Sequence, residues 1–239
     1  MDNLKNALEY AVELASPTTY EINGETFSSH PLHRINEKGV GLVSALEVST
    51  LTGFVDYIAS NRDNIDISKT MVVISGTRSV DLISVPNKDK KREIYITAKA
   101  IVPDHNWGRW IDNEDFVIGL QSKFAPGGDK DTLMKYIGNM QEDQGVQTMD
   151  DGISQKIVAK TGIANVSNVI LPNPVNLRPY RTFQELVQVE SSFTFRVRKG
   201  GECALFEADG GEWAVRCRMV IKEYLNEQLS NIPEIIIIG

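Results

Sequence analysis

The sequence predicts an α+β fold with antiparallel β-sheets built from hairpins and with the helices segregated to one side. Residues 71–101 contain three runs rich in β-branched residues, separated by short polar segments, as in an antiparallel meander. Asn23–Gly24 stands between two further runs and is typical of a tight hairpin turn. Residues 113–142 carry apolar residues at helical spacing on both sides of Pro126, as in a pair of antiparallel helices.

Length and composition indicate an ordinary folded protein. The chain has 239 residues, of which 41% are hydrophobic and 24% are charged, which suits a substantial core. We expect a single elaborated α+β domain over 1–239, with a possible subdivision into 1–105 and 106–239. The net charge of -7 argues against a general nucleic-acid coating protein, because sequence-independent affinity comes mainly from cationic groups.

The first elements are predicted from spacing and from turn signals. Residues 2–15 carry apolar residues at helical spacing. This helix should end at Ser16, because the residue before Pro17 is pushed out of the helical region. We expect residues 19–22 and 25–28 to be the paired strands of the first hairpin.

A strand, a capped helix and the meander are expected next. The strand is predicted over 40–46, and Thr50 is predicted as the N-cap of the helix that follows. That helix places four apolar side chains on one face: Leu51, Phe54, Val55 and Ile58. The meander strands are predicted at 71–74, 80–85 and 93–101.

The helix pair over 113–142 has recognisable starting signals. Asn113 is the expected N-cap of the first helix, with Glu114 and Asp115 in the first turn, where the helix dipole favours negative charge. Asp129 or Asp131 is expected to open the second helix.

Two hairpins and an extended segment follow. The hairpins are expected to pair 146–149 with 153–160, and 189–197 with 202–208. Between them, residues 171–180 contain three prolines, which favour an extended path.

The chain is expected to close with a helix from about 212 to 229 and a short terminal strand. Four consecutive isoleucines in an unpaired tail would be an aggregation hazard, so we expect the tail to be paired in a sheet. These residues are Ile235, Ile236, Ile237 and Ile238. Either they form the last strand of the chain's own sheet, or they form a strand donated to a neighbouring subunit. We expect a homo-oligomer to which these isoleucines contribute.

Cysteine usage and the N-terminus point to the cytoplasm. Cys203 and Cys217 are the only cysteines, and we expect two buried thiols, with a disulfide between them as the alternative. The N-terminus lacks the apolar run of a signal peptide, and no stretch is long enough to span a bilayer. The sequence therefore predicts a cytoplasmic protein without a membrane partner.

The arginines are unevenly distributed. Six of the eleven fall between 178 and 218, interleaved with aromatic residues, in an otherwise acidic chain. Arginine presents a planar fork of donors suited to phosphate or carboxylate, and aromatic rings offer faces for a base. This block is therefore where we expect an anionic ligand to bind.

Periodicity narrows the block to four arginines, and Tyr180 joins them as a neighbouring ring. Two-residue alternation turns Arg196 and Arg198 away from the core face of their strand, whereas Arg216 and Arg218 point in different directions on a helix. Residues 178–181 lie on the extended segment, where we expect the side chains to be free to meet a partner. The predicted ligand-binding residues are Arg178, Tyr180, Arg181, Arg196 and Arg198.

These arginines have an alternative role. Glu202 and Glu207 lie on the partner strand of the hairpin, and ordinary cross-strand ion pairs with them would leave the arginines without a ligand.

The residues that could support catalysis form a weaker pattern than the arginine block. Asp104–His105 beside Trp107 can supply acid–base groups, and Asp112, Glu114 and Asp115 can either hold a divalent cation or simply cap a helix. No phosphate-binding loop or nucleophile elbow occurs. We therefore expect no enzymatic activity, no cofactor and no resident metal.

Several segments together carry a resemblance to a known family. They are Trp107-x-x-Trp110, Glu114-Asp115-Phe116, Asp151-Gly152-Ile153-Ser154-Gln155, Arg181-Thr182-Phe183, Phe195-Arg196-Val197-Arg198 and the run 204–213. Over most of its length after about residue 45, the chain resembles the YfdQ-like family of phage and prophage proteins. The resemblance implies an accessory gene product of phage or prophage origin, and it assigns no functional residue.

Together these observations predict a non-enzymatic phage accessory protein in the cytoplasm of a bacterial host. It would act by self-association and by binding an anionic partner, such as single-stranded nucleic acid, a nucleotide or a host defence factor. The alternatives are a self-assembling structural phage protein and a divalent-cation-dependent hydrolase or nuclease.

Overall fold

The computed structural model describes residues 2–22, 24–29, 44–87, 90–138, 148–150, 155–157, 171–198 and 200–239. Its contacts divide the chain into two compact units, 1–42 and 43–239. The predicted fold class is confirmed, because mixed and antiparallel sheets are combined with helices and a C-terminal helix is followed by a short strand. The expected single domain with a possible boundary after residue 105 stays a prediction.

The first unit contains a helix and a hairpin at the predicted positions. Helix α1 spans Asp2–Ala15, and strands β1 (Thr19–Ile22) and β2 (Glu25–Ser28) pair antiparallel. Gly24 in the turn has a φ of 81°, which glycine adopts without strain. The apolar residues Leu4, Leu8 and Val12 of α1 are all exposed.

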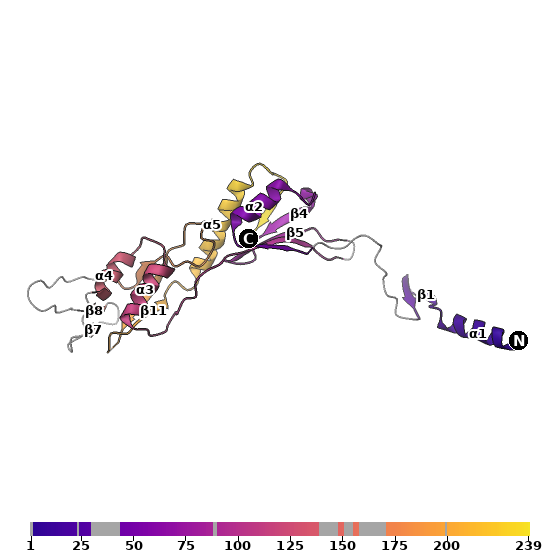
Figure 1. The fold of residues 1–239 in the computed structure, drawn as a ribbon, viewed down its shortest axis with the longest axis horizontal. Coiled ribbons are helices and arrows are strands. Elements are labelled where there is room, and N and C mark those ends of the chain that lie inside the picture. The colour runs from indigo at the N-terminus through magenta and orange to yellow at the C-terminus, as the bar shows by residue number, and fades with distance from the viewer. Residues whose placement is uncertain are drawn as a thin grey trace, which may run out of the picture. The chain divides into compact units, whose positions relative to one another are not determined.

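A five-stranded mixed sheet forms one half of the second unit (Figure 1). Its strands, in spatial order, are β12 (Ile236–Ile238), β4 (Thr70–Val73), β5 (Ser79–Ser84), β6 (Ile94–Lys99) and β3 (Leu46–Val48). The predicted antiparallel meander is confirmed as β4–β5–β6, and β12 and β3 add parallel pairs at its two edges. Of the strand expected over 40–46, residues 40–43 lie outside the described residues.

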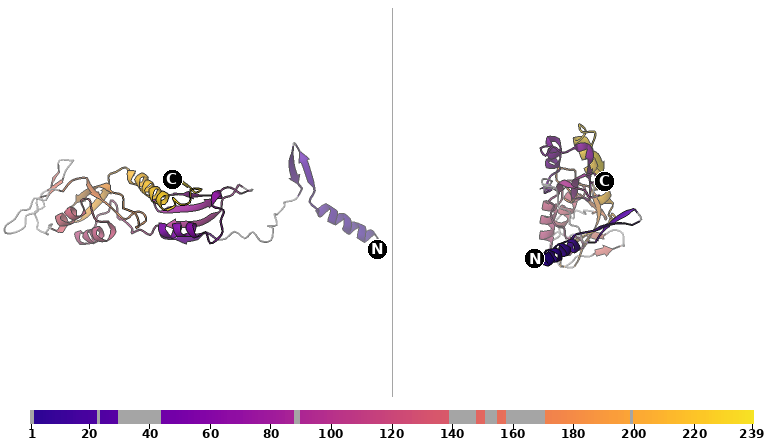
Figure 2. Two further views of the ribbon diagram at one scale, coloured as in Figure 1. Left: turned by 90° about the horizontal axis from the view of Figure 1, so that it is seen from above. Right: turned by 90° about the vertical axis from the view of Figure 1, so that its right-hand side faces the viewer.

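Helices α2 (Leu51–Ser60) and α5 (Glu212–Gln228) cover one face of this sheet. Figure 1 shows both on the same side of β4 and β5, and the left view of Figure 2 shows strands of the sheet between their ribbons. We call their shared interior the first core. It includes Phe54, Ile58, Val72, Leu82, Phe183, Ile221 and Leu225.

Helix α2 is capped twice. Thr50 is the predicted N-cap, and its Oγ1 accepts a hydrogen bond from the amide of Gly53 at 3.1 Å. The carboxylate of Glu185 also accepts hydrogen bonds from the amides of Leu51 and Thr52, at 2.7 and 2.8 Å. Free amides at a helix N-terminus favour a negative group, so this distant side chain fixes the helix to the 181–190 segment.

The isoleucine tail pairs within its own sheet. Ile236–Ile238 run parallel to β4, as in the first of the two alternatives. Ile235 and Ile237 are half-buried against the first core. By alternation Ile236 and Ile238 point to the opposite face, where they are 61% and 48% exposed. A contribution of these isoleucines to an oligomer stays a prediction.

A three-stranded sheet forms the other half of the second unit. Strand β10 (Ser191–Val197) lies between β11 (Cys203–Glu207) and β9 (Val175–Leu177), and all pairs are antiparallel. The predicted hairpin of β10 and β11 is confirmed. Strands β7 (Thr148–Asp150) and β8 (Gln155–Ile157) form a separate antiparallel pair, as predicted, although their connection lies outside the described residues.

Helices α3 (Asn113–Lys123) and α4 (Lys130–Gly138) pack on the three-stranded sheet and enclose the second core. This core is rich in aromatic residues. It includes Phe116, Leu120, Phe124, Leu133, Tyr136, Phe193, Phe195 and Leu205. The predicted cap of α3 is wrong by one residue, because the amide of Asp115 donates to Asp112 Oδ1 at 2.9 Å and Asn113 is already helical.

Both cysteines are free and buried, as expected. Burial raises the pKa of the Cys203 thiol to about 12 and also raises that of Cys217, so neither is a thiolate at neutral pH. None of the helices in the described ranges combines the length and the apolar character needed to cross a bilayer.

Candidate functional site

Residues 107–111 extend the three-stranded sheet beyond β11. The amide of Gly108 donates to the carbonyl of Leu205 at 2.8 Å, and Ile111 and Cys203 exchange two backbone hydrogen bonds of 3.0 and 2.8 Å. The segment consists of a turn at 106–109, in which Gly108 has a φ of 69°, followed by a single antiparallel bridge between Ile111 and Cys203. Trp107 packs against the second core, whereas Trp110 packs edge-to-face on Phe206 with a centroid distance of 6.2 Å.

The sheet consequently has two distinct faces. We call the face that packs against α3 and α4 the inner face, and the opposite one the outer face. Strand register places Phe193 and Phe195 on the inner face. Thr194 and Arg196 lie on the outer face, and their cross-strand neighbours on that same face are Phe206 and Ala204.

Arg181 lies inside the protein. It is only 4% exposed, so the expectation that its side chain lies at the surface is wrong. Its guanidinium carbon lies 4.8, 5.0 and 4.4 Å from the ring centroids of Trp107, Phe193 and Trp213. One nitrogen, Nη1, lies 3.0 Å from Glu207 Oε1. The cation is therefore stabilised by three aromatic rings and one carboxylate.

The electrostatics of Arg181 reflect this burial. Loss of hydration lowers its pKa to about 10, and Glu207 and Asp209 oppose that change. Within the described part of the chain its guanidinium nitrogens make no well-directed hydrogen bond, so the contact with Glu207 is mainly Coulombic. Arg181 still carries its charge at neutral pH, and its role is structural.

The extended segment is folded against the protein by its own polar groups. The amide of Arg181 donates to Gln188 Oε1 at 3.1 Å, and Gln188 Nε2 donates to the carbonyls of Phe183 and Leu186 at 3.0 Å each. The amide of Tyr180 donates to the Lys123 carbonyl at 3.0 Å. The backbone of this segment is therefore fixed in place by local hydrogen bonds.

Arg178 and Tyr180 are only partly accessible. Arg178 Nε lies 3.1 Å from Glu190 Oε2, and both side chains are 38% exposed. The side chain of Tyr180 is half-buried, and its carbonyl accepts a hydrogen bond from His105. Neither residue is presented as freely as the sequence suggested.

Arg198 and Arg196 lie on the outer face, as predicted. The guanidinium of Arg198 stacks 4.9 Å from the ring centroid of Trp110, and its Nε lies 2.6 Å from Glu202 Oε2. Nη1 of Arg196 is buried and has no hydrogen-bond partner among the described residues. Arg178 follows β9, where its guanidinium pairs with Glu190 and lies next to Gly127 in the loop between α3 and α4.

The expected cross-strand ion pairs form in part. Glu202 pairs with Arg198, as the alternative predicted. Glu207 lies opposite Phe193 on the inner face and pairs with Arg181 instead. The outer face therefore has one carboxylate close to Arg198, and Arg196 pairs with neither glutamate.

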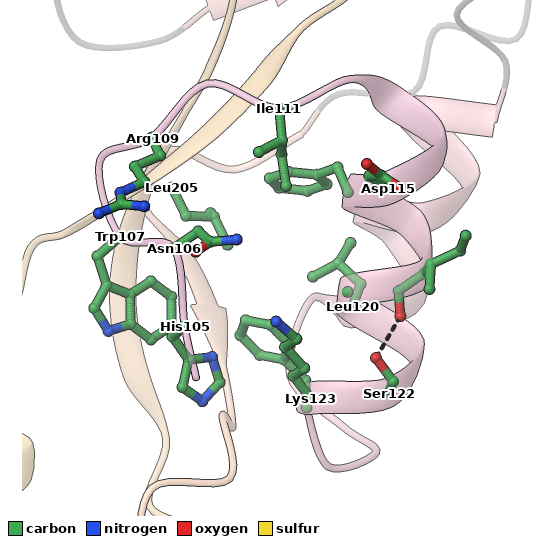
Figure 3. Close-up of a pocket in the computed structure, with 14 residues that line it drawn as sticks. His105, Asn106, Trp107, Arg109, Ile111, Asp115, Leu120, Ser122, Lys123 and Leu205 are labelled. Atoms are coloured by element: carbon green, nitrogen blue, oxygen red, sulfur yellow. Dashed lines mark hydrogen bonds between the residues drawn. The ribbon is translucent and has the colours of Figure 1, made fainter. Parts of the chain in front are cut away.

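A cavity of about 270 Å³ lies on the inner side, between the 105–111 segment and α3 (Figure 3). His105, Trp107 and Arg109 line one side of it, and Asp115 and Leu120 of α3 line the other. Sequence reasoning noted His105 beside Trp107 but did not identify a cavity. The signal was limited to the clustering of polar residues around the two tryptophans.

His105 is oriented from both sides. Its ring stacks on Trp107 at 4.5 Å and 7°, and its Nε2 lies 3.1 Å from the Tyr180 carbonyl. A carbonyl only accepts hydrogen bonds, so the proton resides on Nε2. Burial lowers the pKa of His105 below its ordinary value of 6.5, which favours the neutral ring at neutral pH.

Metal-ligand geometry is absent from the described residues. No group of three His, Cys, Asp or Glu side chains there is placed to hold a metal ion. Asp112 caps α3, as the alternative for the acids at 112–115 predicted.

Comparison of the chain with protein-family models, curated proteins and solved structures found no match. The resemblance to the YfdQ-like family therefore stays a prediction.

Proposed function

We propose that this chain is a non-enzymatic phage accessory protein that binds a single-stranded nucleic acid through the outer face of the β9–β10–β11 sheet. The observation that carries the proposal is the stacking of Arg198 on Trp110 beside Phe206, which is 36% exposed. A single strand needs both cations for its phosphates and aromatic rings for its bases. The phage setting is supported by the sequence resemblance alone.

The spacing of the charged groups suits a backbone of repeating phosphates. Arg196 and Arg198 lie on the same side of β10, with roughly 7 Å between their Cα atoms. Arg178 is a third cation, beyond the end of β9 and paired with Glu190, and Arg181 is left out because it is buried. A local cluster of this kind lets a protein of net charge -7 bind an anionic partner.

Filter binding with a single-stranded oligonucleotide over a salt series tests this proposal. We expect the double variant Arg196→Gln/Arg198→Gln to bind more weakly and to flatten the slope of log affinity against log salt by about 1.4, or about 0.7 per lost phosphate contact. Trp110→Leu should weaken binding without changing the slope, because stacking releases no counterions.

The matched control is Arg62→Gln, which removes an exposed arginine from the turn after α2. It should leave both affinity and slope unchanged. Absence of binding by the wild type at low salt would refute the proposal, as would equal effects of the control and the double variant.

Self-association is the second part of the proposal, and it rests on the uncovered face of the five-stranded sheet. Register places Ile236 opposite Met71, Met71 opposite Ile83, and Ile238 opposite Val73 on that face, where the apolar side chains lie at the β12 edge and Asp81 and Thr97 follow in the interior of the sheet. No described helix covers these side chains, and β12 is an edge strand with free backbone groups. An apolar strip beside an edge strand favours pairing with a second copy.

Sedimentation velocity over a concentration series tests self-association. Ile236→Thr/Ile238→Thr keeps β-branched residues in the strand and should shift the protein towards monomer. Val187→Thr is the control, because Val187 is 75% exposed and lies outside this face. A wild type that is monomeric at all concentrations, or a double variant with unchanged association, would contradict this part of the proposal.

A further inference from the structure

The cavity beside α3 has an apolar floor and polar groups at its rim. Phe116, Leu120 and Leu205 contribute side chains from the second core, and all three are at least nine-tenths buried. Arg109 and Asp115 are exposed and line the same cavity. Figure 3 shows these two charged residues on opposite sides. The site thus combines apolar surface with two opposite charges.

Some polar groups around the cavity already have protein partners. His105 donates to the Tyr180 carbonyl, Lys123 Nζ donates to the Asp104 carbonyl at 2.7 Å, and Ser122 Oγ donates to the Ile118 carbonyl at 2.7 Å. These bonds hold the walls in place. They also reduce the capacity of these three side chains to bind a ligand.

Arg109 and Asp115 differ from these three residues in their contacts. The Arg109 side chain makes no hydrogen bond or ion pair with another described residue. The Asp115 side chain lies beside the carboxyl group of Asp112, with which it shares a side-chain hydrogen bond, and it forms no ion pair with a described cation. Neither charge is neutralised by an ion pair among the described residues, and the two residues line opposite sides of the cavity. A ligand with one anionic and one cationic group would satisfy both.

Base stacking is disfavoured in this cavity. Trp107 is its largest aromatic wall, and its ring already stacks on His105 at 4.5 Å and on Phe193 at 4.9 Å. Two rings stacked on the same face would contact each other, and the described ring contacts include none between His105 and Phe193. Both faces of Trp107 are therefore occupied, and the ligand must present an apolar body rather than a base.

Size limits the ligand further. A volume of about 270 Å³ corresponds to roughly nine water molecules at about 30 Å³ each. That room suits a compact molecule of on the order of ten non-hydrogen atoms and is at the lower end for ligand pockets.

We propose that the cavity binds a small zwitterion of the amino-acid class, with its carboxylate on Arg109, its ammonium on Asp115 and an apolar side chain against Phe116, Leu120 and Leu205. The guanidinium fork matches a carboxylate, and the carboxylate of Asp115 accepts hydrogen bonds from an ammonium group. This site lies on the inner side of the sheet and is independent of the nucleic-acid proposal.

Isothermal titration calorimetry on the full chain with L-leucine tests the ligand class without any mutation. We expect saturable binding in the millimolar range or tighter. Two analogues each remove one charge: 4-methylpentanoate lacks the ammonium group, and 3-methylbutylamine lacks the carboxylate. Each should bind about tenfold more weakly than L-leucine, because one charged wall is left without a partner.

Two variants then test which residue binds the carboxylate of the ligand and which binds its ammonium group. Arg109→Gln should weaken L-leucine binding about tenfold and leave 3-methylbutylamine unaffected, because that analogue has no carboxylate. Asp115→Asn should weaken L-leucine to a similar degree and leave 4-methylpentanoate unaffected. Both residues are exposed, so Arg109→Gln should unfold at the same temperature as the wild type, and Asp115→Asn, which removes a negative charge from the first turn of α3, should unfold within a few degrees of it.

Matched controls separate contact from general charge effects. Glu114→Gln removes an acid from the same first turn of α3 without lining the cavity, and Arg62→Gln removes a distant exposed arginine. Both should bind L-leucine within about twofold of the wild type. The proposal is overturned if L-leucine does not bind at 10 mM, if an analogue binds as tightly as L-leucine, or if a control weakens binding as much as its partner variant.

Discussion

The inner and outer faces of the β9–β10–β11 sheet contain the same combination of groups in opposite environments. On the inner face Arg181 contacts three aromatic rings and Glu207 and is buried. On the outer face Arg198 contacts one ring and Glu202 and is exposed to water. The comparison shows that an arginine beside aromatic rings is not by itself a binding signal. Hydration decides whether the guanidinium stabilises the fold or remains available to a partner.

The largest expected effect is the difference in the free energy of unfolding between alanine variants of Arg181 and Arg198. We expect Arg181→Ala to lower the free energy of unfolding by about 3 kcal/mol, because it removes a buried cation and leaves Glu207 and three rings without their partner. Arg198→Ala should leave the stability unchanged within error, because water replaces its contacts. Urea denaturation measures both. Similar losses for the two variants would break the comparison between the faces.

The two tryptophans of the 107–110 motif allow the two faces to be compared with the same substitution, tryptophan to leucine, at each position. Trp107→Leu should cost about 2 kcal/mol, because the ring contacts His105, Phe124, Phe193 and Arg181. Trp110→Leu should cost about 1 kcal/mol or less and should affect oligonucleotide binding instead. If Trp110→Leu proved the more destabilising of the two, the outer face would have to be reinterpreted as part of a core.

The smallest expected effect is a pH dependence on the inner side. Because burial lowers the pKa of His105 in the folded state, the unfolded chain takes up a proton more readily as the pH falls below about 6.5. Stability should therefore decrease through that range. In His105→Gln the decrease should be shallower, and melting temperatures measured between pH 7.5 and pH 5 compare the two. Parallel curves would show that His105 does not contribute.

Much of the fold could be predicted because its signals are local. The hairpin at Asn23–Gly24, the cap at Thr50 and the alternation along 193–198 each depend on a few neighbouring residues. The cap of α3 was missed by one position, because Asp112 and Asn113 are equally suitable caps and only the backbone geometry selects between them.

The burial of Arg181 could not be predicted from its neighbours in the sequence. Its three rings come from residues 107, 193 and 213, which belong to a loop, a strand and a helix far apart in the sequence. A proline-rich segment indicates an extended backbone, but it gives no information about what packs on that backbone. The cavity has the same origin, because the 105–111 segment and α3 form its walls only after both have packed on the sheet.

Arg181 also joins the two cores. Trp213 packs against the first core, and Trp107 and Phe193 belong to the side of the second. A partial opening that separated the two halves would have to pull one cation away from rings on both sides, which raises the free energy of that opening. Amides in β5 and β10 should therefore show the same opening free energy in native-state hydrogen exchange. In Arg181→Ala the two values should move apart, which would show that this side chain contributes to the coupling between the two halves of residues 43–239.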